Sequence, residues 1–330
     1  MINDARSQFR DAIRAAGLEP PEVIEPGKLV RYPGVGKRNG NTAGWCKLFD
    51  DGQGGCFGDW SSGFTANWQA KLDRPFSQTE RAAFIRRVEE TRKLAETERR
   101  MQYADAAAKA IAIWDAAASA NDEHPYLDRK KIKANGVRFQ HGELVVPVRS
   151  GDELYSLQFI AGDGKKRFLS GGRITGGYFS IGTVKGAEAL CIAEGFATGA
   201  TVHQATGYPV AVAFNAGNLE PVAKSMRERL PNLPMIICAD DDAATEGNPG
   251  ITKANRAAIA SGASVAVPDF GEQCPKGATD FNDMAGLHGL EAVARAIRGA
   301  TAPAQANNAS WPDPLPLTIR TDPEPYPLDA

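Results

Sequence analysis

The sequence predicts an α/β protein whose C-terminal part is a compact, doubly wound, mostly parallel sheet. Two apolar runs, residues 189–193 and 235–239, are short and bounded by turn residues, which is typical of strands buried on both faces. Around them, further apolar runs alternate with helical periodicity, as right-handed βα crossovers require. Before residue 187 the pattern changes, and it predicts a basic α+β subdomain, a long helix and a small β module rich in Gly and Trp.

Composition excludes several classes of protein. A chain of 330 residues has room for about two domains. A hydrophobic content of 42% and a charged content of 24% are ordinary for a globular protein. No apolar stretch approaches the roughly 20 residues that span a bilayer, and no secretory signal pattern begins the chain. With five scattered cysteines, these features predict a cytoplasmic protein in a reducing compartment, with no membrane partner.

Charge is distributed unevenly along the chain. Residues 1–185 carry 29 Lys and Arg against 23 Asp and Glu, whereas residues 186–330 carry 9 against 17. A basic part beside an acidic part suits a polyanion held by one and metal-dependent chemistry in the other. Uneven surface charge without functional meaning is an equally good interpretation of the count alone.

The N-terminal elements follow from spacing and capping signals. Phe9, Ile13 and Leu18 lie on one face of a helix over residues 1–18. Glycines then punctuate residues 28–70, which predicts a β module of hairpins. The remaining signals are an Asp51-Gly52 tight turn, a Ser77/Glu80 capping box that begins a helix over residues 77–119, and a short helix at 124–132 with His124 in a structural or capping position.

Aromatic residues in the β module allow two interpretations. Trp45 and Trp60, interleaved with Lys37 and Arg38, can stack single-stranded bases while the cations hold phosphates. A module this small equally needs its aromatic side chains to make a core. The cysteines of the module lack the spacing of a zinc site, so no structural zinc is expected.

Residues 142–182 alternate as strands and carry a cluster of cations. Runs at 144–148, 154–160 and 167–169 are separated by Gly- and Asp-containing turns. Lys165, Lys166, Arg167 and Arg173 cluster at one hairpin end, where they can seat a phosphate backbone or a triphosphate. The alternative is a solvated hairpin tip.

The βα alternation begins at residue 189 and ends near residue 298. Its expected strands are 189–193, 209–214, 235–239 and 264–267, and its expected helices are 196–206, 219–229, 251–261 and 289–298. Residues 302–330 contain seven prolines, which predicts an extended linker rather than a domain. We expect that linker to lead toward a missing C-terminal domain.

Carboxylates follow the predicted strands. Glu194 ends the first strand, and Asp240 and Asp242 follow the strand at 235–239; Asp280 and Asp283 form a later acidic pair. The carboxyl ends of parallel strands meet at one edge of the sheet, and like charges gathered there repel unless a cation lies between them. Oxygen ligands favour a hard ion, Mg²⁺ or Mn²⁺.

A strand-ending Glu-Gly, an Asp-x-Asp and a later acidic pair together resemble the Toprim domain, over about residues 187–300. DnaG-type primases, topoisomerases and some nucleases share that domain. With His124-Pro125-Tyr126-Leu127 and the hairpin that carries Lys165–Leu169, the chain is similar to the Toprim primases of phages, plasmids and mobile elements. The resemblance divides it into residues 1–72 (a relative of a zinc-binding domain without the metal ligands), 73–120 (a helical spacer), 121–186 (a basic subdomain), 187–300 (Toprim) and 301–330 (a linker).

The resemblance implies a DNA primase, a nucleotidyltransferase that joins nucleotides on single-stranded DNA. Asp240 and Asp242, with Asp280 or Asp283, match metal-holding acids, and Glu194 matches a further ligand or the group that assists proton removal. Where the family often has an acid four residues after the glutamate, this chain has Thr198. Implied partners are template, nucleoside triphosphates and a helicase-like ATPase domain or replication helicase; a Toprim nuclease and a non-catalytic nucleic-acid-binding module are the alternatives.

Overall fold

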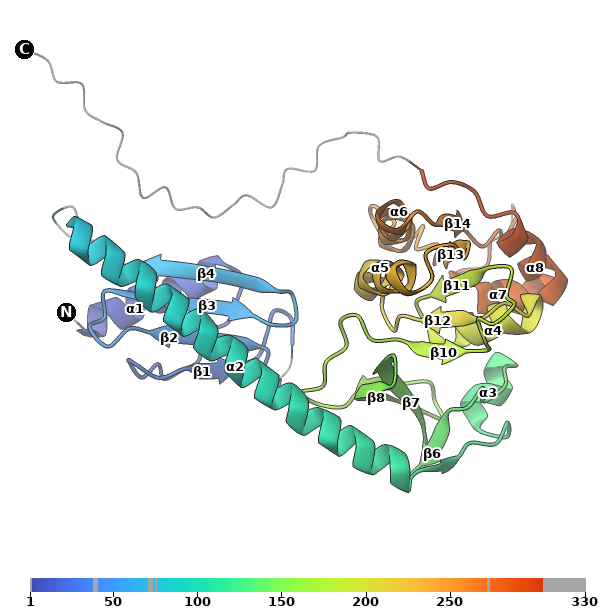
Figure 1. The fold of residues 1–330 in the computed structure, drawn as a ribbon, viewed down its shortest axis with the longest axis horizontal. Helices are drawn as coiled ribbons and strands as arrows, with labels where there is room; N and C mark the ends of the chain where they lie inside the picture. The colour runs from blue at the N-terminus through green and yellow to red at the C-terminus, as the bar shows by residue number, and fades with distance from the viewer. Residues whose placement is uncertain (1, 38–40, 71–73, 75, 272–273, 305–330) are drawn as a thin grey trace, which may run out of the picture. The chain divides into compact units, whose positions relative to one another are not determined.

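The computed structural model describes residues 2–37, 41–70, 74, 76–271 and 274–304. The chain divides into two compact units, which meet within one long helix between residues 101 and 102. Figure 1 traces the elements in chain order. Among the described residues, no helix is both long enough and apolar enough to cross a membrane.

The first unit is a four-stranded antiparallel sheet with a helix on each face. Helix α1 (Ile2–Ala15) packs Phe9 and Ile13 against one face, and the first part of α2 (Gln78–Ala116) packs Val88 and Ala95 against the other. The strands, in the order β1-β2-β3-β4, are β1 (Val30–Tyr32), β2 (Gly44–Leu48), β3 (Gly54–Asp59) and β4 (Phe64–Gln69).

Several local predictions hold in this unit. The β2–β3 connection contains Asp51-Gly52, and Gly52 has a positive φ of 69°, a conformation that costs glycine little. The capping box is formed, since the Glu80 N–H donates to Ser77 Oγ at 3.2 Å and the Ser77 N–H donates to Glu80 Oε2 at 2.8 Å. Helix α2 therefore begins one residue after Ser77.

The second unit contains an antiparallel sheet in the strand order β5-β6-β7-β8-β9. Alternate residues of β7 point to opposite faces: Leu144 and Val146 join a large core shared with the following sheet, whereas Val145 packs against Ala110 on the last part of α2. The elements are β5 (Ala118–Ser119), α3 (Pro125–Lys130), β6 (Arg138–Gln140), β7 (Glu143–Ser150), β8 (Glu153–Ala161) and β9 (Lys166–Phe168).

His124 caps the short helix α3, as predicted. Its Nδ1 accepts the Tyr126 N–H at 3.3 Å, and its Nε2 lies 3.2 Å from the Gly142 carbonyl oxygen. The preceding long helix stops at Ala116, three residues before the predicted end, because Ala118 and Ser119 pair with β6. Sequence reasoning did not find β5 or β6, since strands of two or three residues are too short to show a period.

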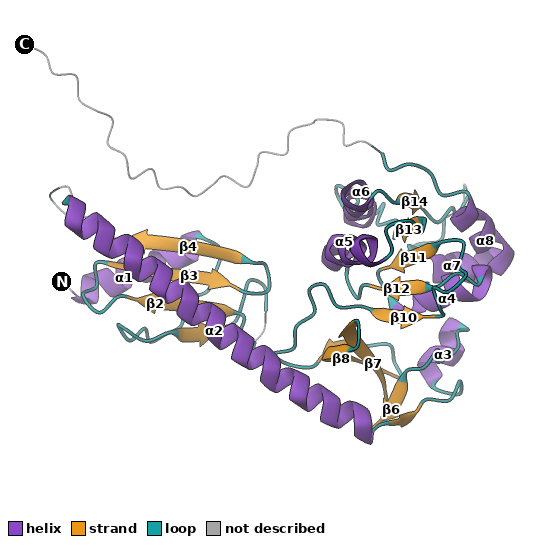
Figure 2. Cartoon of the chain, in the orientation of Figure 1, coloured by secondary structure: helices purple, strands orange, loops and turns teal. Residues whose placement is uncertain are grey.

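The second sheet of this unit is the doubly wound one, in the order β10-β12-β11-β13-β14. Its last four strands are parallel, and β10 pairs antiparallel with β12. Figure 2 shows α5 and α6 on one face and α4, α7 and α8 on the other. The bounds are β10 (Phe179–Ile181), β11 (Leu190–Ala193), α4 (Phe196–Thr206), β12 (Val210–Val212), α5 (Leu219–Arg229), β13 (Met235–Cys238), α6 (Pro249–Ser261), β14 (Ser264–Ala266), α7 (Phe281–His288) and α8 (Leu290–Arg298).

The prediction differs from this sheet in three places. Strand β10 was missed because it is three residues long. Helix α6 begins two residues earlier than predicted, since Asn248 caps it and Pro249 takes the first helical position. Helix α7 was missed, because Asp280 and Asp283 were interpreted only as an acidic pair, although Asp280 caps the helix.

Candidate active site

The acidic residues gather where the strand order of the parallel sheet reverses. From the central strand β11 the chain steps to β12 on one side, and β13 and β14 lie on the other. In such a sheet a crevice opens at the carboxyl ends of the two strands that flank the reversal, and ligands bind there. Glu194 follows β11 and Asp240 follows β13. The topology therefore brings these two carboxylates to one crevice.

Asp240 is the most perturbed group of this crevice. Burial, followed by the negative charges of Glu194, Asp280 and Asp242, raises the pKa of its carboxyl from 3.8 to about 8, while Lys166 opposes that shift. Its Oδ1 is buried and has no hydrogen-bond partner among the described residues. A buried acceptor without a donor is costly, so this oxygen is suited to receive a cation or a proton.

Glu194 is held from the loop that follows β12. The Ala216 N–H donates to its carboxylate, and Lys253 and Lys166 attract it. Burial, the largest effect, and the charge of Asp242 nevertheless raise its pKa above the ordinary value. Glu194 thus combines a fixed orientation with an increased affinity for protons, as a group that accepts a proton requires.

Asp242 is oriented by the start of α6. The Gly250 N–H donates to its Oδ2 at 3.1 Å, and its own N–H donates to Asn248 Oδ1 at 2.9 Å. Asn248 also donates from Nδ2 to Asp241 Oδ1 at 2.6 Å. Sequence reasoning assigned no role to Asn248-Pro249-Gly250; the signal that assigns it a role is an N-cap Asn followed by Pro, directly after an acidic loop.

Asp280 and Asp283 both take part in capping the N-terminus of α7. The Asp283 N–H donates to Asp280 Oδ1 at 2.8 Å, and the Thr279 N–H donates to Asp283 Oδ2 at 3.1 Å. Thr198 Oγ1 donates to Asp280 Oδ2 at 2.9 Å, and Lys130 Nζ lies 3.4 Å from Asp283 Oδ1. Asp280 still adds charge to Asp240, whereas Asp283 is an N3 residue of a capping arrangement.

Of the four cations near the β8–β9 hairpin, Lys166 faces the carboxylates. Asp280, Asp240 and Glu194 attract its ammonium group, although burial of that group lowers its pKa overall. Its Nζ lies 3.8 Å from the point that a Cβ on Gly195 would occupy. The residue as a whole is exposed to solvent.

The other three cations have different partners. Lys165 pairs with Asp163 at 2.8 Å, Arg167 stacks on Phe159 with its guanidinium carbon 4.0 Å from the ring centre, and Arg173 stacks on Tyr155 at 4.5 Å. Neighbouring side chains of a strand point to opposite faces, which separates Lys166 from Lys165 and Arg167.

Four of the predicted nucleic-acid-binding residues belong to the first unit: Lys37, Arg38, Trp45 and Trp60. Trp45 is 2% exposed and belongs to the core, so the core interpretation holds for its ring. Trp60 is partly exposed and lies under Arg31, whose guanidinium carbon is 4.0 Å from the ring centre. Lys37 is exposed, and Arg38 lies outside the described residues.

Cys46 and Cys56 lie on opposite faces of the first sheet. Cys46 packs with Phe9 and Phe57, and Cys56 packs with Trp45 and Phe49. Burial raises the pKa of both thiols to about 12. Two side chains on opposite faces cannot ligate one ion, and both behave as small apolar groups.

The crevice offers oxygen donors of the kind that hard divalent cations prefer. Across the described residues, no group of three or more His, Cys, Asp or Glu side chains already lies in a geometry that could hold a metal ion. The raised pKa of Asp240 and its partnerless Oδ1 are nevertheless the features that a cation would relieve. Asp240, Asp242 and Glu194 therefore fit a divalent ion chemically.

This electrostatic arrangement makes stability depend on pH. Folded Asp240 keeps its proton up to a pKa of about 8, whereas the unfolded carboxyl ionises near 3.8. The folded state therefore binds more protons between these values, and we expect the free energy of unfolding in EDTA to fall as pH rises from about 5 to about 8. Mg²⁺ should reduce this fall. Urea titrations at several pH values test it; an Asp240→Asn variant with the same slope would contradict it.

Comparison with known proteins identifies the domain family of the doubly wound sheet. The family model of the Toprim domain matches residues 189–291. Two proteins of Escherichia coli, each called DNA primase TraC, are similar to the chain: one is 30% identical over 339 aligned positions and covers 93% of the chain, and the other is 32% identical over 295 positions and covers 80%. The chain spans only 31% and 20% of the lengths of these relatives.

A solved structure is similar over most of the chain. The zinc-binding and RNA polymerase domains of the Aquifex aeolicus primase align with 91% of this chain and 85% of that one, at 14% identity and a TM-score of 0.37. The sheet order, the position of the acids and the family match agree with one another, and residues 189–291 form a Toprim domain within a chain similar to DNA primase TraC.

Proposed function

We propose that this chain is a DNA primase that synthesises short primers on single-stranded DNA by divalent-metal-dependent nucleotidyl transfer. The observation that carries the proposal is the set of carboxylates at the reversal of the Toprim sheet, with Lys166 facing them. The similarity to DNA primase TraC supports it. As partners we propose the template strand, nucleoside triphosphates and a replication helicase or helicase-like ATPase domain.

Each residue of the crevice has a proposed task. Asp240 and Asp242 hold Mg²⁺ or Mn²⁺, with Glu194 as a further ligand or as the group that accepts the proton of the attacking 3′-hydroxyl. When bound, the metal lowers the pKa of that hydroxyl and neutralises charge that develops on the triphosphate. Asp280 contributes negative charge to Asp240 and anchors α7, and Thr198 orients Asp280. Asp283 maintains the cap of α7, and we propose it only as a more distant candidate for holding the metal.

Lys166 is the cation that we assign to the incoming triphosphate. Replacing it with Met keeps the length of the stem and removes the charge. We expect kcat/KM for the nucleotide to fall by about 10- to 100-fold, since a hydrogen bond to a charged group is worth about 1.5–3 kcal/mol. Lys165→Met is the matched control, because Lys165 pairs with Asp163. Equal losses of kcat/KM in both variants would contradict this assignment. The cations of the cluster would then be general contacts to the nucleic-acid strand: Lys165, Lys166, Arg167 and Arg173.

The proposed function is tested by de novo primer synthesis. Labelled nucleoside triphosphates and short single-stranded templates are incubated with the chain and Mg²⁺ or Mn²⁺. We expect short products that depend on template and metal. Degradation of the template instead would establish a nuclease. Salt-sensitive DNA binding with neither synthesis nor degradation would establish a non-catalytic binding module.

A further inference from the structure

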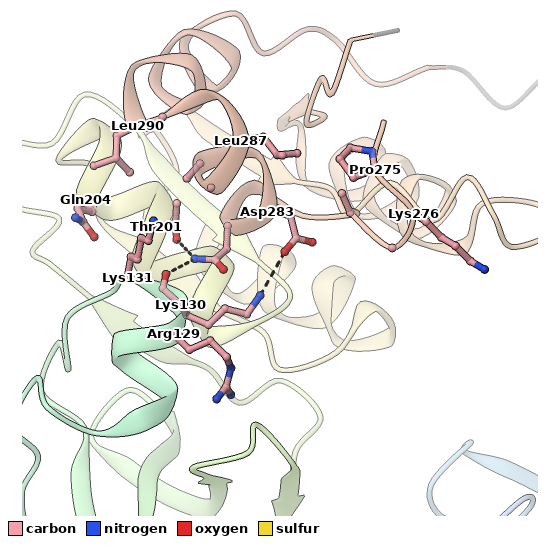
Figure 3. A pocket seen from close by; sticks show the side chains of 16 residues that line it. Arg129, Lys130, Lys131, Thr201, Gln204, Pro275, Lys276, Asp283, Leu287 and Leu290 are labelled. Atoms are coloured by element: carbon pink, nitrogen blue, oxygen red, sulfur yellow. Dashed lines mark hydrogen bonds and ion pairs between the residues drawn. The ribbon is translucent and has the colours of Figure 1, made fainter. Parts of the chain in front are cut away.

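The second unit contains a pocket of about 750 Å³ that we call the α3–α7 pocket. It is walled by the end of α3, the second half of α4, the segment 275–278, and α7 with the start of α8. Figure 3 shows it from close by. Asp283 lines it, and the Asp283 N–H donates to Asp280 of the acidic crevice. The start of α7 therefore carries both a residue of the pocket and a residue of the acidic crevice.

The charge of the α3–α7 pocket is opposite in sign to the formal net charge of residues 186–330. Its charged lining consists of Arg129, Lys130, Lys131 and Lys276 against Asp283, which makes a formal balance of four positive charges to one negative. Residues 186–330, which supply most of the walls, carry 9 Lys and Arg against 17 Asp and Glu. A basic pocket in an acidic region concentrates anions at that place.

Two of these cations have no side-chain hydrogen bond or ion pair among the described residues. Lys130 lies 3.4 Å from Asp283, and Arg129 donates from Nη1 to the Gly162 carbonyl oxygen at 2.9 Å. Lys131 and Lys276 are exposed, and neither forms an ion pair with a described acid. Their charges are available to a ligand.

The floor of the pocket is held together by a buried amide. Asn282 donates from Nδ2 to the Lys130 carbonyl oxygen at 2.7 Å and to Thr201 Oγ1 at 2.9 Å. These bonds connect α7 with the end of α3 and with α4. The pocket is therefore preformed, and a ligand does not have to bear the cost of ordering it.

The opposite wall is apolar. Leu287 is 47% exposed and Leu290 is 37% exposed, and both line the pocket. Figure 3 shows these leucines above the basic side chains, which are spread along the pocket from Lys131 to Lys276 rather than converging on one point. Cations in a row beside an apolar surface suit repeated phosphates that carry sugars and bases, and suit a single phosphate less well.

We propose that the α3–α7 pocket holds the sugar–phosphate backbone of the single-stranded template as it passes the acidic crevice. This inference rests on the proposed function for the identity of the strand. Lys131 and Lys276 contact phosphates, and the two leucines exclude water from the sugars and bases. The pocket adds affinity without reading sequence, because its charged contacts go to the backbone.

The test is the binding of a labelled single-stranded oligonucleotide to the full chain, followed by fluorescence anisotropy over a range of salt concentrations. Lys131 has a positive φ of 52°, so it is replaced by Asn, which tolerates that conformation. In the double variant Lys131→Asn/Lys276→Ala we expect weaker binding and a salt slope reduced by about 0.7 for each lost phosphate contact. Lys185→Ala, a change at another exposed lysine, should leave both quantities unchanged.

The outcomes separate this inference from the proposed function. Wild-type affinity and slope in the double variant, with an unchanged thermal unfolding midpoint, would overturn the pocket assignment even if the chain makes primers. A double variant that loses binding of a labelled nucleoside triphosphate but keeps the strand would also overturn it. If the double variant loses strand binding and the wild type makes no primers, the pocket assignment would be supported and the proposed primase function would be refuted.

Discussion

Replacing Asp240 with Asn is expected to abolish primer synthesis and to stabilise the metal-free fold. Activity should fall at least about 1,000-fold, which corresponds to about 4 kcal/mol of transition-state stabilisation, because the proposed metal site loses a buried carboxylate. Stability in EDTA at pH 8 should rise by on the order of 1–3 kcal/mol, a screened fraction of the raised pKa, since Asp240 is partly exposed. Primer assays and urea titrations measure the two effects.

Asp241→Asn is the matched control for this prediction. The same change from Asp to Asn is made at the next residue. There, Asp241 Oδ1 accepts a hydrogen bond from Asn248 Nδ2, and an asparagine oxygen can also accept that bond. We expect activity within a few-fold of wild type and no stabilisation. Full activity of Asp240→Asn in the presence of Mg²⁺ would remove Asp240 from the mechanism.

Replacing Gly250 with Ala is expected to damage both fold and activity without touching a charged group. A Cβ at this position would lie 2.2 Å from the Asp240 carbonyl oxygen and 3.0 Å from Asp242 Oδ2. The loop that carries both aspartates must shift, which we expect to cost about 1–3 kcal/mol of stability. Displacement of the ligands should lower primer synthesis by about 100-fold. Thermal unfolding and the primer assay test this.

Gly286→Ala provides the control for helix propensity. Gly286 lies within α7, and apart from its chain neighbours and the nearby backbone of its own helix no atom lies within 4 Å of the point that its Cβ would occupy. An added methyl group there should stabilise the helix by about 0.5–1 kcal/mol. If Gly250→Ala also stabilises the protein, the close approach of α6 to the aspartate loop is not a constraint.

Sequence reasoning succeeded where chemistry is local. The Ser77/Glu80 box, the His124 cap and the turn at Asp51-Gly52 depend on residues a few positions apart. The Toprim strands were found because runs such as residues 235–238 are apolar throughout. Short elements such as β10 and β5 had no such signal, because two or three residues acquire their strand conformation from a neighbour.

The candidate site also has features that the sequence predicts and features that only the structure shows. That Glu194 and Asp240 lie at the same edge of one sheet follows from the sequence, since carboxyl ends of parallel strands share an edge. That their strands are neighbours is shown only by the structure. Sequence reasoning grouped Lys165, Lys166 and Arg167, whereas the register of β9 sends only Lys166 toward the acids. It gave Asp280 and Asp283 only as candidate metal ligands, and the structure shows in addition that both cap α7.

By itself, the sequence determined the fold class, the four parallel strands of the Toprim sheet and the acids that end two of them, because buried periodicity and strand-end chemistry are properties of short segments. Only the tertiary structure decided which carboxylate loses its hydrogen-bond partners, which lysine faces it, and that Gly250 must have no side chain. These facts depend on contacts between residues such as Asp240 and Lys166, which lie far apart in the chain. The strand register and helix packing that create such contacts are set by the whole core.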